Sequence, residues 1–298
     1  LSRGQSTLEK RIAKHSSLDV YRGFAEVEVL PWVGKFERPD RKRWQSAIFA
    51  SDFHDKEFDP FVREVFLDTI KRVQPTIICL VGDVYDNYEF SRFDKDPRRF
   101  DIAGRMAYVR DEIFRPIREA APSAQIDLIF GNHEHHVIRH MADRTPEMRV
   151  ILSDFMGLSM ADIFGIREME INLVTQHDLA AFRASDVRAE IAKNRKTYFN
   201  CLTATHYPDP KFKLGVNWNG GHTHTPALYA SSSELLGGLT GVTNGCMARI
   251  DASYVEKNRN QNGFSIVHFD TQNSRCQQDQ IVFADDYVNV AGTLYLRR

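Results

Sequence analysis

The chain has 298 residues, of which 42% are hydrophobic and 27% charged, and its formal net charge is -1. These values are ordinary for a water-soluble globular protein that can bury a large core. The near-zero net charge gives no overall argument for binding nucleic acid or an anionic membrane. No apolar run approaches the roughly 18 residues of a transmembrane helix. The N-terminal residues lack the apolar stretch of a secretory signal, so we expect a cytoplasmic protein that does not bind membranes.

The four cysteines are far apart in the sequence and show no CxxC pairing, which is typical of reduced thiols in a protein of this size. The first 44 residues mix polar and apolar segments, and the alternating stretch 25–29 is typical of a strand. We expect residues 1–44 to form an N-terminal extension packed on a main domain that spans 45–298.

Strands and helices alternate in the first half of the main domain. The expected strands are the apolar runs 47–50, 76–81 and 126–130, and the expected helices between them are 60–73 and 102–117. Asp59 followed by Pro60 predicts the start of the first helix, since an N-cap acid and a proline in the first turn are both favourable there. This alternation predicts a mostly parallel α/β sheet.

The second half of the chain is rich in expected strands. They lie at 170–175, 199–205, 239–247, 263–269 and 280–290. A second sheet stacked on the first would accommodate them, and we therefore predict a layered α/β sandwich in one domain.

A polar cluster follows each of the first three expected strands. SDFHD follows the first, GDVYD the second and GNHEHH the third, while THYPD follows a strand of the second half and GGHTHTP comes shortly after. Ligands of open α/β sheets bind beyond the carboxyl ends of the strands. We therefore expect these distant clusters to converge on one edge.

The clusters offer carboxylate, amide and imidazole groups and no thiolate. One such residue at a strand end is usually structural or solvated, but here five segments supply them. This donor set suits divalent manganese, iron, zinc or similar ions. The candidate metal ligands are Asp52, His54, Asp83, Asn132, His206, His222 and His224.

The order of these motifs, D-x-H, G-D-x-x-D, G-N-H-[DE], a later His and G-H-x-H, resembles the calcineurin-like metallophosphoesterase family. The motifs read Asp52-Phe53-His54, Gly82 to Asp86, Gly131 to Glu134, His206, and Gly221 to His224. The resemblance covers 47–226. The stretches 241–246 and 262–264 are in turn similar to the tail of phage-type members, and the nuclease-like branch is the one we expect. The resemblance implies an αββα sandwich with mixed sheets flanked by helices.

The resemblance also implies a role for each matched residue. Asp52, His54 and His224 would hold one divalent metal, Asn132, His206 and His222 the second, and Asp83 would bridge them. Two cations about 3.5–4 Å apart clamp a phosphoryl group and activate a bridging water, and the resulting hydroxide attacks phosphorus. Manganese is the first expectation, with iron, zinc, nickel and magnesium as alternatives.

Three further assignments concern histidines and one acid. His133 would protonate the leaving group or stabilise the phosphate, and Asp86 would orient and charge it. His206 is preferred over His177 for the second metal, because an apolar run precedes it and Tyr-Pro follows. The next segment is expected to be helical and contains His135, His136 and His140. We expect these histidines to lie on the surface or behind the metal ligands, without binding a metal themselves.

The substrate is less well specified by the sequence. Family members that act on phosphoproteins carry Arg after the second motif, where this chain has Asn87. The segment 85–100 interleaves aromatic rings with cations, which suits single-stranded nucleic acid, and its Arg92, Arg98 and Arg99 are candidate substrate contacts. The alternative is a solvated loop whose rings anchor it to the core.

Three functions are therefore compared. The first is a hydrolase of phosphodiester bonds in nucleic acid or nucleotides, with DNA or RNA as the expected substrate. The second is a phosphomonoesterase, and the third is a non-catalytic scaffold stabilised by metals. A scaffold tolerates loss of His133 or a ligand, yet every catalytic position is filled, which favours an enzyme.

Overall fold

The structure, a computed structural model, describes residues 40, 42–92, 94–175, 193–208, 215–233, 237–251 and 260–297. The chain divides into two compact units, Leu1–Arg41 and Lys42–Arg298. The expected strand at 25–29 and most of the expected extension lie outside the described residues, so the domain boundary stays a prediction. Among the described helices, none combines the length and apolarity needed to cross a membrane.

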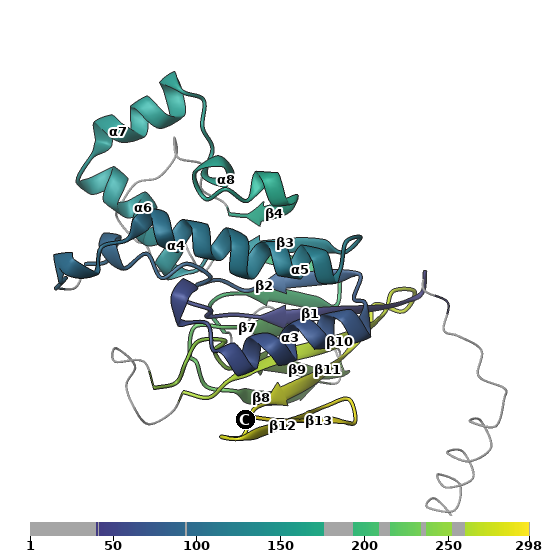
Figure 1. The fold of residues 1–298 in the computed structure, drawn as a ribbon. Helices are drawn as coiled ribbons and strands as arrows, with labels where there is room; N and C mark the ends of the chain where they lie inside the picture. Colours follow the sequence, from purple (N-terminus) through teal and green to yellow (C-terminus); the bar gives the residue numbers. More distant parts are fainter. Residues whose placement is uncertain are drawn as a thin grey trace, which may run out of the picture. The chain divides into compact units, whose positions relative to one another are not determined.

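The larger unit is built around a six-stranded mixed sheet with the order β11-β10-β1-β2-β3-β4 (Figure 1). Its parallel strands are β1 (Trp44–Ala50), β2 (Ile77–Leu80), β3 (Gln125–Ile129) and β4 (Ile171–Val174). Strands β10 (Gly263–Asp270) and β11 (Arg275–Val282) continue the sheet in antiparallel fashion beyond β1. The parallel arrangement expected for the first three strands is confirmed.

A second, five-stranded mixed sheet has the order β5-β6-β7-β9-β8. It contains β5 (Arg195–Tyr198), β6 (Leu202–Thr205), β7 (Asn217–Gly220), β8 (Ala227–Ser233) and β9 (Gly237–Thr243). Strands β6, β7 and β9 are parallel, whereas β5 and β8 are antiparallel edge strands. A separate hairpin is formed by β12 (Tyr287–Val290) and β13 (Thr293–Leu296). The predicted α/β class with two mixed sheets and helices is confirmed.

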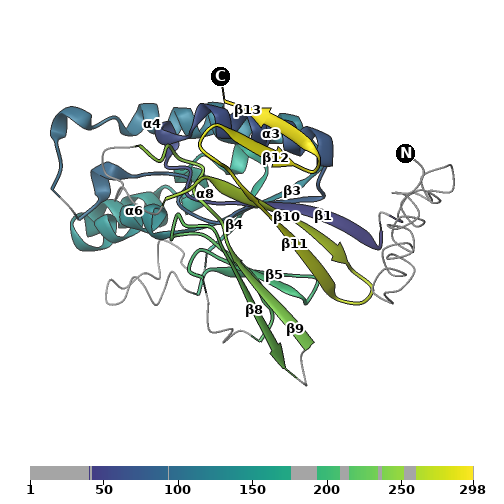
Figure 2. The same cartoon turned by 90° about the horizontal axis from the view of Figure 1, so that it is seen from below.

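Helices follow β1 and β2 and cover one face of the six-stranded sheet, and the five-stranded sheet lies on its other face (Figure 2). Helix α3 (Pro60–Val73) begins where the Asp59 side chain accepts hydrogen bonds from two backbone N–H groups, as expected. The second expected helix consists of α4 (Ile102–Tyr108), the π-helical segment η4 (Val109–Phe114) and α5 (Arg115–Ala120).

The remaining helical segments lie in the connections. They are η1 (Asp55–Glu57), η2 (Tyr88–Phe90), η3 (Pro97–Arg99), α6 (Asn132–Asp143), α7 (Pro146–Val150), η5 (Ile151–Phe155), α8 (Met160–Ile163) and η6 (Arg167–Met169). Helix α6 begins immediately after β3, so its first turn lies at the edge where the parallel strands end.

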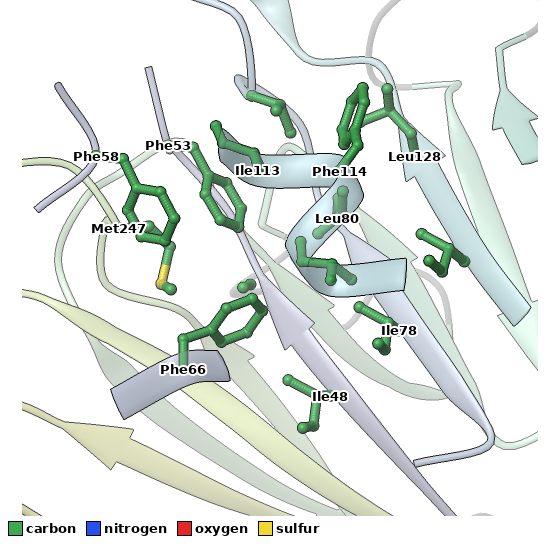
Figure 3. Close-up of a cluster of buried hydrophobic side chains, with 14 of the residues drawn as sticks. Ile48, Phe53, Phe58, Phe66, Ile78, Leu80, Ile113, Phe114, Leu128 and Met247 are labelled. Carbon is green, nitrogen blue, oxygen red and sulfur yellow. The ribbon is translucent and has the colours of Figure 1, made fainter. Parts of the chain in front are cut away.

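Strand β1 is apolar on both faces because each face packs against a different layer. Ile48 and Ala50 join the cluster beneath the helices, where Phe66 and Phe114 also lie (Figure 3). Ala47 and Phe49 belong to a second cluster between the two sheets. Alternate side chains thus enter opposite cores, as is typical of buried parallel strands.

A buried carboxylate also joins the two sheets. Asp127 of β3 is fully buried and accepts hydrogen bonds from Tyr198 Oη and Lys196 Nζ of β5, both at 2.7 Å. Asn172 of β4 donates to the same carboxylate at 3.1 Å. Because these donors satisfy a charge that is costly to bury, they hold β5 against the first sheet.

Candidate metal centre

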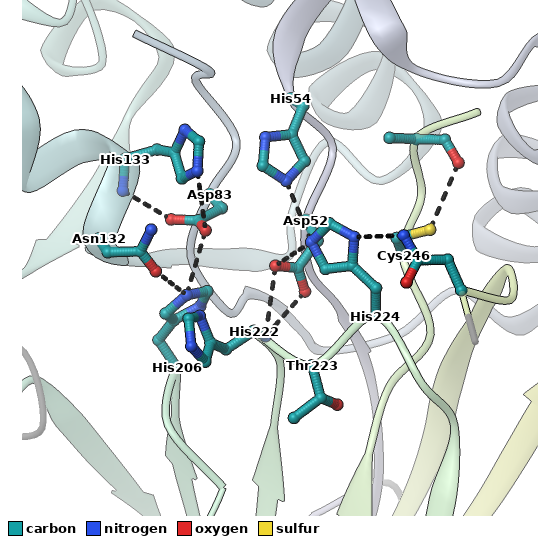
Figure 4. Close-up of polar contacts among 12 residues, drawn as sticks. Asp52, His54, Asp83, Asn132, His133, His206, His222, Thr223, His224 and Cys246 are labelled. Carbon is teal, nitrogen blue, oxygen red and sulfur yellow. Dashed lines mark hydrogen bonds and ion pairs between the residues drawn. The ribbon is translucent and has the colours of Figure 1, made fainter. Parts of the chain in front are cut away.

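The seven candidate ligands come from the ends of strands in both sheets. Asp52 and His54 follow β1, Asp83 follows β2, and Asn132 is the first residue of α6, directly after β3. From the second sheet, His206 follows β6, and the pair His222 and His224 follows β7. The structure brings the side chains of both groups together in one site (Figure 4).

Asp52, His54 and His224 form the first potential ligand set, with one ligand atom of each within 4.8 Å of the others. His224 Nε2 lies 3.2 Å from His54 Nε2 and 3.3 Å from Asp52 Oδ1. Two nitrogens that bind a cation tetrahedrally at about 2.0–2.1 Å are separated by roughly 3.3 Å. The spacing of the two imidazoles therefore fits a shared divalent ion.

Asp83, His206 and His222 form the second potential set by the same criterion. His206 Nε2 lies 3.2 Å from Asp83 Oδ2 and 3.1 Å from Asn132 Oδ1. The other ring nitrogen, Nδ1, lies 2.8 Å from the Val81 carbonyl and can donate to it. That hydrogen bond selects the tautomer in which Nε2 presents a lone pair to the site.

His206 is thus part of the buried cluster, with no exposed surface. Its competitor from the sequence, His177, lies outside the described residues. The preference for His206 over His177 stays a prediction. The position of His206 Nε2 close to Asp83 and Asn132 suits a metal ligand.

Five of the seven candidate ligands have a left-handed backbone. Their φ angles are 60° for Asp52, 52° for His54, 52° for Asp83, 71° for His222 and 55° for His224. Residues other than glycine rarely adopt positive φ, and such conformations cluster at functional sites, where the surrounding structure holds them. The backbone conformation at the strand ends therefore directs these side chains toward one site.

Two motif glycines are required by close packing against the candidate ligands. A Cβ at Gly82, which has φ +86°, would lie 2.4 Å from His206 Nδ1. A Cβ at Gly131 would lie 2.3 Å from Asp83 Oδ1. Any side chain at either position would displace a candidate ligand.

Buried acids and imidazoles strongly perturb one another in this site. Burial alone would raise the pKa of Asp52, but the charge and hydrogen bond of His224 together with the charge of His206 lower it to about 2. Burial would lower the pKa of His224 and of His206, yet Asp52 raises the first to about 11 and Asp83 raises the second to about 9. The carboxylates thus demand a positive charge beside them, which a divalent cation would supply as well as a proton.

His133 lies beside the candidate ligands and is held at two points. Its backbone N–H donates to Asp83 Oδ1 at 2.9 Å. Its Nδ1 lies 2.5 Å from the Asp86 carbonyl and 3.2 Å from Asp86 Oδ1, while Nε2 is 4.0 Å from Asp83 Oδ2. Burial lowers the pKa of His133, but Asp83 and Asp86 outweigh it and raise the pKa to about 10. Asp86 thus contacts this ring through its backbone as well as its side chain.

Two contributors to the site were not recognised from the sequence. The buried Glu134 carboxylate accepts hydrogen bonds from the backbone N–H groups of Asp83, Val84, Tyr85 and Gly131 at 2.7–3.1 Å. On the far side of His224 from Asp52, the side-chain nitrogen Nδ2 of Asn260 lies 3.4 Å from His224 Nδ1. The position of Glu134 in the first turn of α6 was a signal for the first role, whereas nothing in the sequence indicated the second.

The candidate substrate arginines lie outside the buried cluster, and all three are exposed. Arg98 forms a double hydrogen bond with Asp96, and the Arg99 guanidinium lies 4.6 Å from the Tyr88 ring centroid. Within the same segment Tyr85, Asn87, Glu89 and Ser91 are buried. Part of this segment therefore anchors the loop, which was the alternative interpretation.

The later histidines of α6 differ from the surface position considered for them. His135 is fully buried, with Nε2 2.9 Å from Asn194 Nδ2, and His136 is 9% exposed. A surface position is wrong for both, because α6 packs between the sheet edge and the following segments. The rings of His136 and His133 are 4.8 Å apart, so His136 does lie behind the site. His140 is partly exposed and packs against Phe90.

No protein-family model matches this sequence, and no curated protein sequence matches it either. Several solved structures align with most of the chain. A single mutant of Vps29 from Entamoeba histolytica aligns with 84% of this chain and 96% of its own, at 12% identity and a TM-score of 0.38. For the nuclease MPE from Pseudomonas putida the coverages are 84% and 86%, the identity 12% and the TM-score 0.33.

A dimetal phosphatase from Danio rerio aligns over 82% of this chain and 94% of its own, at 9% identity and a TM-score of 0.39. What the chain itself presents is a buried candidate dimetal site of histidine and aspartate side chains.

Proposed function

We propose that this chain is a binuclear metal-dependent phosphoesterase of the calcineurin-like type. The supporting observation is the convergence of seven candidate ligands from five segments, five of them in a left-handed backbone conformation. Asp52, His54 and His224 would hold one cation, and Asn132, His206 and His222 the second. Asp83, which groups with His206 and His222, would share its carboxylate between the two cations.

Two divalent cations held by these residues would supply charge for the phosphoryl oxygens and would lower the pKa of a water molecule. The chain's own residues orient the substrate and move the proton. His133 Nε2 faces the site while Nδ1 is held by Asp86. In this orientation His133 donates its proton to the leaving oxygen, which makes Asp86 a positioning residue. A non-catalytic scaffold would have no use for this arrangement.

The substrate that we propose is a phosphodiester of nucleic acid or nucleotides, with manganese as the first metal to test. The residues that follow the second motif support this choice of substrate. Asn87 replaces the arginine that would grip a terminal phosphate, and its side chain donates to the His133 carbonyl at 2.9 Å. Tyr88 with its stacked Arg99 offers a ring and a cation for a nucleobase and a phosphate. Arg98 contributes less, since Asp96 already neutralises it.

The test is hydrolysis of bis-p-nitrophenyl phosphate and of p-nitrophenyl phosphate with added Mn²⁺, followed by single-stranded DNA and RNA. We expect the diester to be cleaved faster and the activity to disappear in Asp83→Ala, which should also lose at least one ion in metal analysis. Faster cleavage of the monoester would indicate a phosphomonoesterase. A protein that binds two metals and cleaves neither ester would be a scaffold, and full metal occupancy in Asp83→Ala would contradict the bridging role.

A further inference from the structure

Arg105 is a partly buried cation that none of the motifs contains. It lies in α4, and its side chain is only 11% exposed. Three carboxylates surround its guanidinium group. Nη1 lies 2.6 Å from Asp55 Oδ1 and 3.7 Å from Asp86 Oδ2, and Nε lies 3.5 Å from Glu89 Oε1. Three buried carboxylates this close together repel one another unless a cation pairs with them. The guanidinium of Arg105 supplies that positive charge.

The two oxygens of Asp86 face different partners. Oδ2 is turned toward Arg105, whereas Oδ1 lies 3.4 Å from His54 Nδ1 and 3.2 Å from His133 Nδ1. Each of these imidazoles directs its other nitrogen, Nε2, toward the candidate ligands. A single carboxylate therefore orients a proposed metal ligand and the proposed general acid, and Arg105 contacts that carboxylate from behind.

The same guanidinium also connects the loops that carry the ligands. Asp55 follows His54 in the loop after β1, and its Oδ2 accepts the backbone N–H of Asp86 at 3.0 Å. Glu89 Oε1 accepts the backbone N–H of Asp101 at 2.7 Å, and Asp101 is the N-cap of α4. Arg105 thus pairs with acids that fix both the loop containing Asp86 and the start of its own helix.

We propose that Arg105 is a positioning residue of the metal centre, which acts through Asp86 on His54 and His133. The inference rests on the proposed function for its meaning, but its first readout is metal binding rather than activity. Without the guanidinium, Asp86 would face Asp55 and Glu89 with no countercharge and would turn away from them. His54 would then lose the partner of its Nδ1. Loss of such a partner behind a metal ligand typically costs about 10–100-fold in metal affinity.

The experiment is a titration of the metal-free full chain with Mn²⁺ in the variant Arg105→Gln. We expect one of the two ions to bind about 10–100-fold more weakly, while the ion held by Asn132, His206 and His222 keeps its affinity. Arg105→Lys retains the charge and should recover most of the loss. Arg118→Gln is the matched control, since Arg118 is a partly buried arginine of α5 that bonds to the carbonyls of Ala124, Met169 and Glu170. It should lower the melting temperature without changing either metal affinity.

A double-mutant cycle with Asp86→Asn tests the route of action. If Arg105 acts through Asp86, adding Arg105→Gln to Asp86→Asn should weaken metal binding less than about twofold further, because the losses of coupled residues do not add. The proposal would be overturned if the losses of metal affinity in the two single variants added fully in the double variant. It would also be overturned if Arg105→Gln weakened the binding of both metals equally. If the wild type binds two metals and Arg105→Gln binds them equally well, the positioning role alone fails. If the wild type binds no pair of metals, the proposed function fails with it.

Discussion

At the scale of single residues, the orientation of His133 is fixed by contacts of both its backbone and its ring. Its backbone N–H is bound to Asp83 Oδ1, and its ring Nδ1 contacts both the carbonyl and the carboxylate of Asp86. The ring packs edge-on against His54, with centroids 4.6 Å apart. These contacts leave Nε2 as the one ring atom directed at the site, which suits transfer of a proton to a leaving oxygen.

His133→Asn should therefore slow chemistry and leave the metals bound. General acid catalysis is typically worth about 10²–10⁴-fold, and it matters most for poor leaving groups. We expect the rate on a natural diester with an alkoxide leaving group to fall by that amount, and the rate on p-nitrophenyl esters to fall much less. At Mn²⁺ concentrations that saturate both sites, Asp86→Asn should slow the same reaction less, because the backbone carbonyl of Asp86 still contacts Nδ1.

Two results would count against this role of His133. Equal rate losses for both classes of leaving group would leave phosphate binding as the better account. Loss of metal in His133→Asn, measured by metal analysis of the purified variant, would mean that the residue belongs among the ligands.

The candidate ligands could be predicted from the sequence because their motifs are short and local. Asp52, Asp83 and Asn132 directly follow apolar strands, and parallel strands end at the same edge. Arg105 could not be predicted in this way. It lies in a helix with no motif, and only the folded chain shows that α4 brings it to Asp86. The contact between Asn260 and His224 likewise joins residues 36 positions apart, and no motif contains Asn260.

At the scale of elements, the first turn of α6 is connected to the end of β2 by one side chain. Glu134 Oε1 accepts the N–H groups of Val84 and Tyr85, and Oε2 accepts those of Asp83 and Gly131. All four partners are donors, so both oxygens must act as acceptors. The carboxylate thereby fixes the backbone of two motif loops at once.

Glu134→Gln should disrupt this junction although the shape is nearly unchanged. The amide –NH₂ would face backbone N–H groups that need an acceptor, and buried groups left without a partner cost about 1–3 kcal/mol each. We expect the free energy of unfolding to fall by about 2–4 kcal/mol and metal affinity to fall with it, measured by urea denaturation and Mn²⁺ titration. The control is Glu147→Gln on the exposed face of α7, which should change stability by less than about 0.5 kcal/mol. If Glu134→Gln changed neither the free energy of unfolding nor the Mn²⁺ affinity, the two loops would hold their conformation without the carboxylate.

Elements with a clear apolar period were predicted, and those without one were not. Strand β7 reads Asn-Trp-Asn-Gly, which is too short and too polar to predict a buried strand, yet its Asn219 is buried in a hydrogen-bonded network. Asn219 donates to Ser265 Oγ and Gln278 Oε1, both at 3.1 Å, and accepts from Asn244 Nδ2 at 2.7 Å. The expected strand at 280–290 is in fact the end of β11 followed by β12, separated by a turn.

At the scale of the whole molecule, the two sheets meet at several polar places. One is the buried Asp127, which joins β3 to β5 through Tyr198 and Lys196, and another is the network of Asn219 with Ser265 and Gln278. A further one is the proposed metal centre, to which the first sheet contributes four candidate ligands and the second sheet three. A stacked second sheet was predictable from the strand-rich second half, but the pairing across the interface depends on tertiary packing. Bound metals would therefore connect the sheets as well as serve catalysis.

Metal removal should accordingly lower the stability of the whole unit. A ligand that binds only the folded state at 100 times its dissociation constant stabilises it by about 2.7 kcal/mol. For a domain of roughly 150–250 residues, 1 kcal/mol corresponds to about 2–4 °C in melting temperature. We expect a chelator to lower the melting temperature of the Mn²⁺-loaded protein by roughly 5–10 °C for each ion removed, measured by calorimetry. In Asp83→Ala the chelator should have a smaller effect, whereas Arg118→Gln should melt lower yet respond to chelation like the wild type. An unchanged wild-type melting temperature on chelation would mean that the metals do not hold the sheets together.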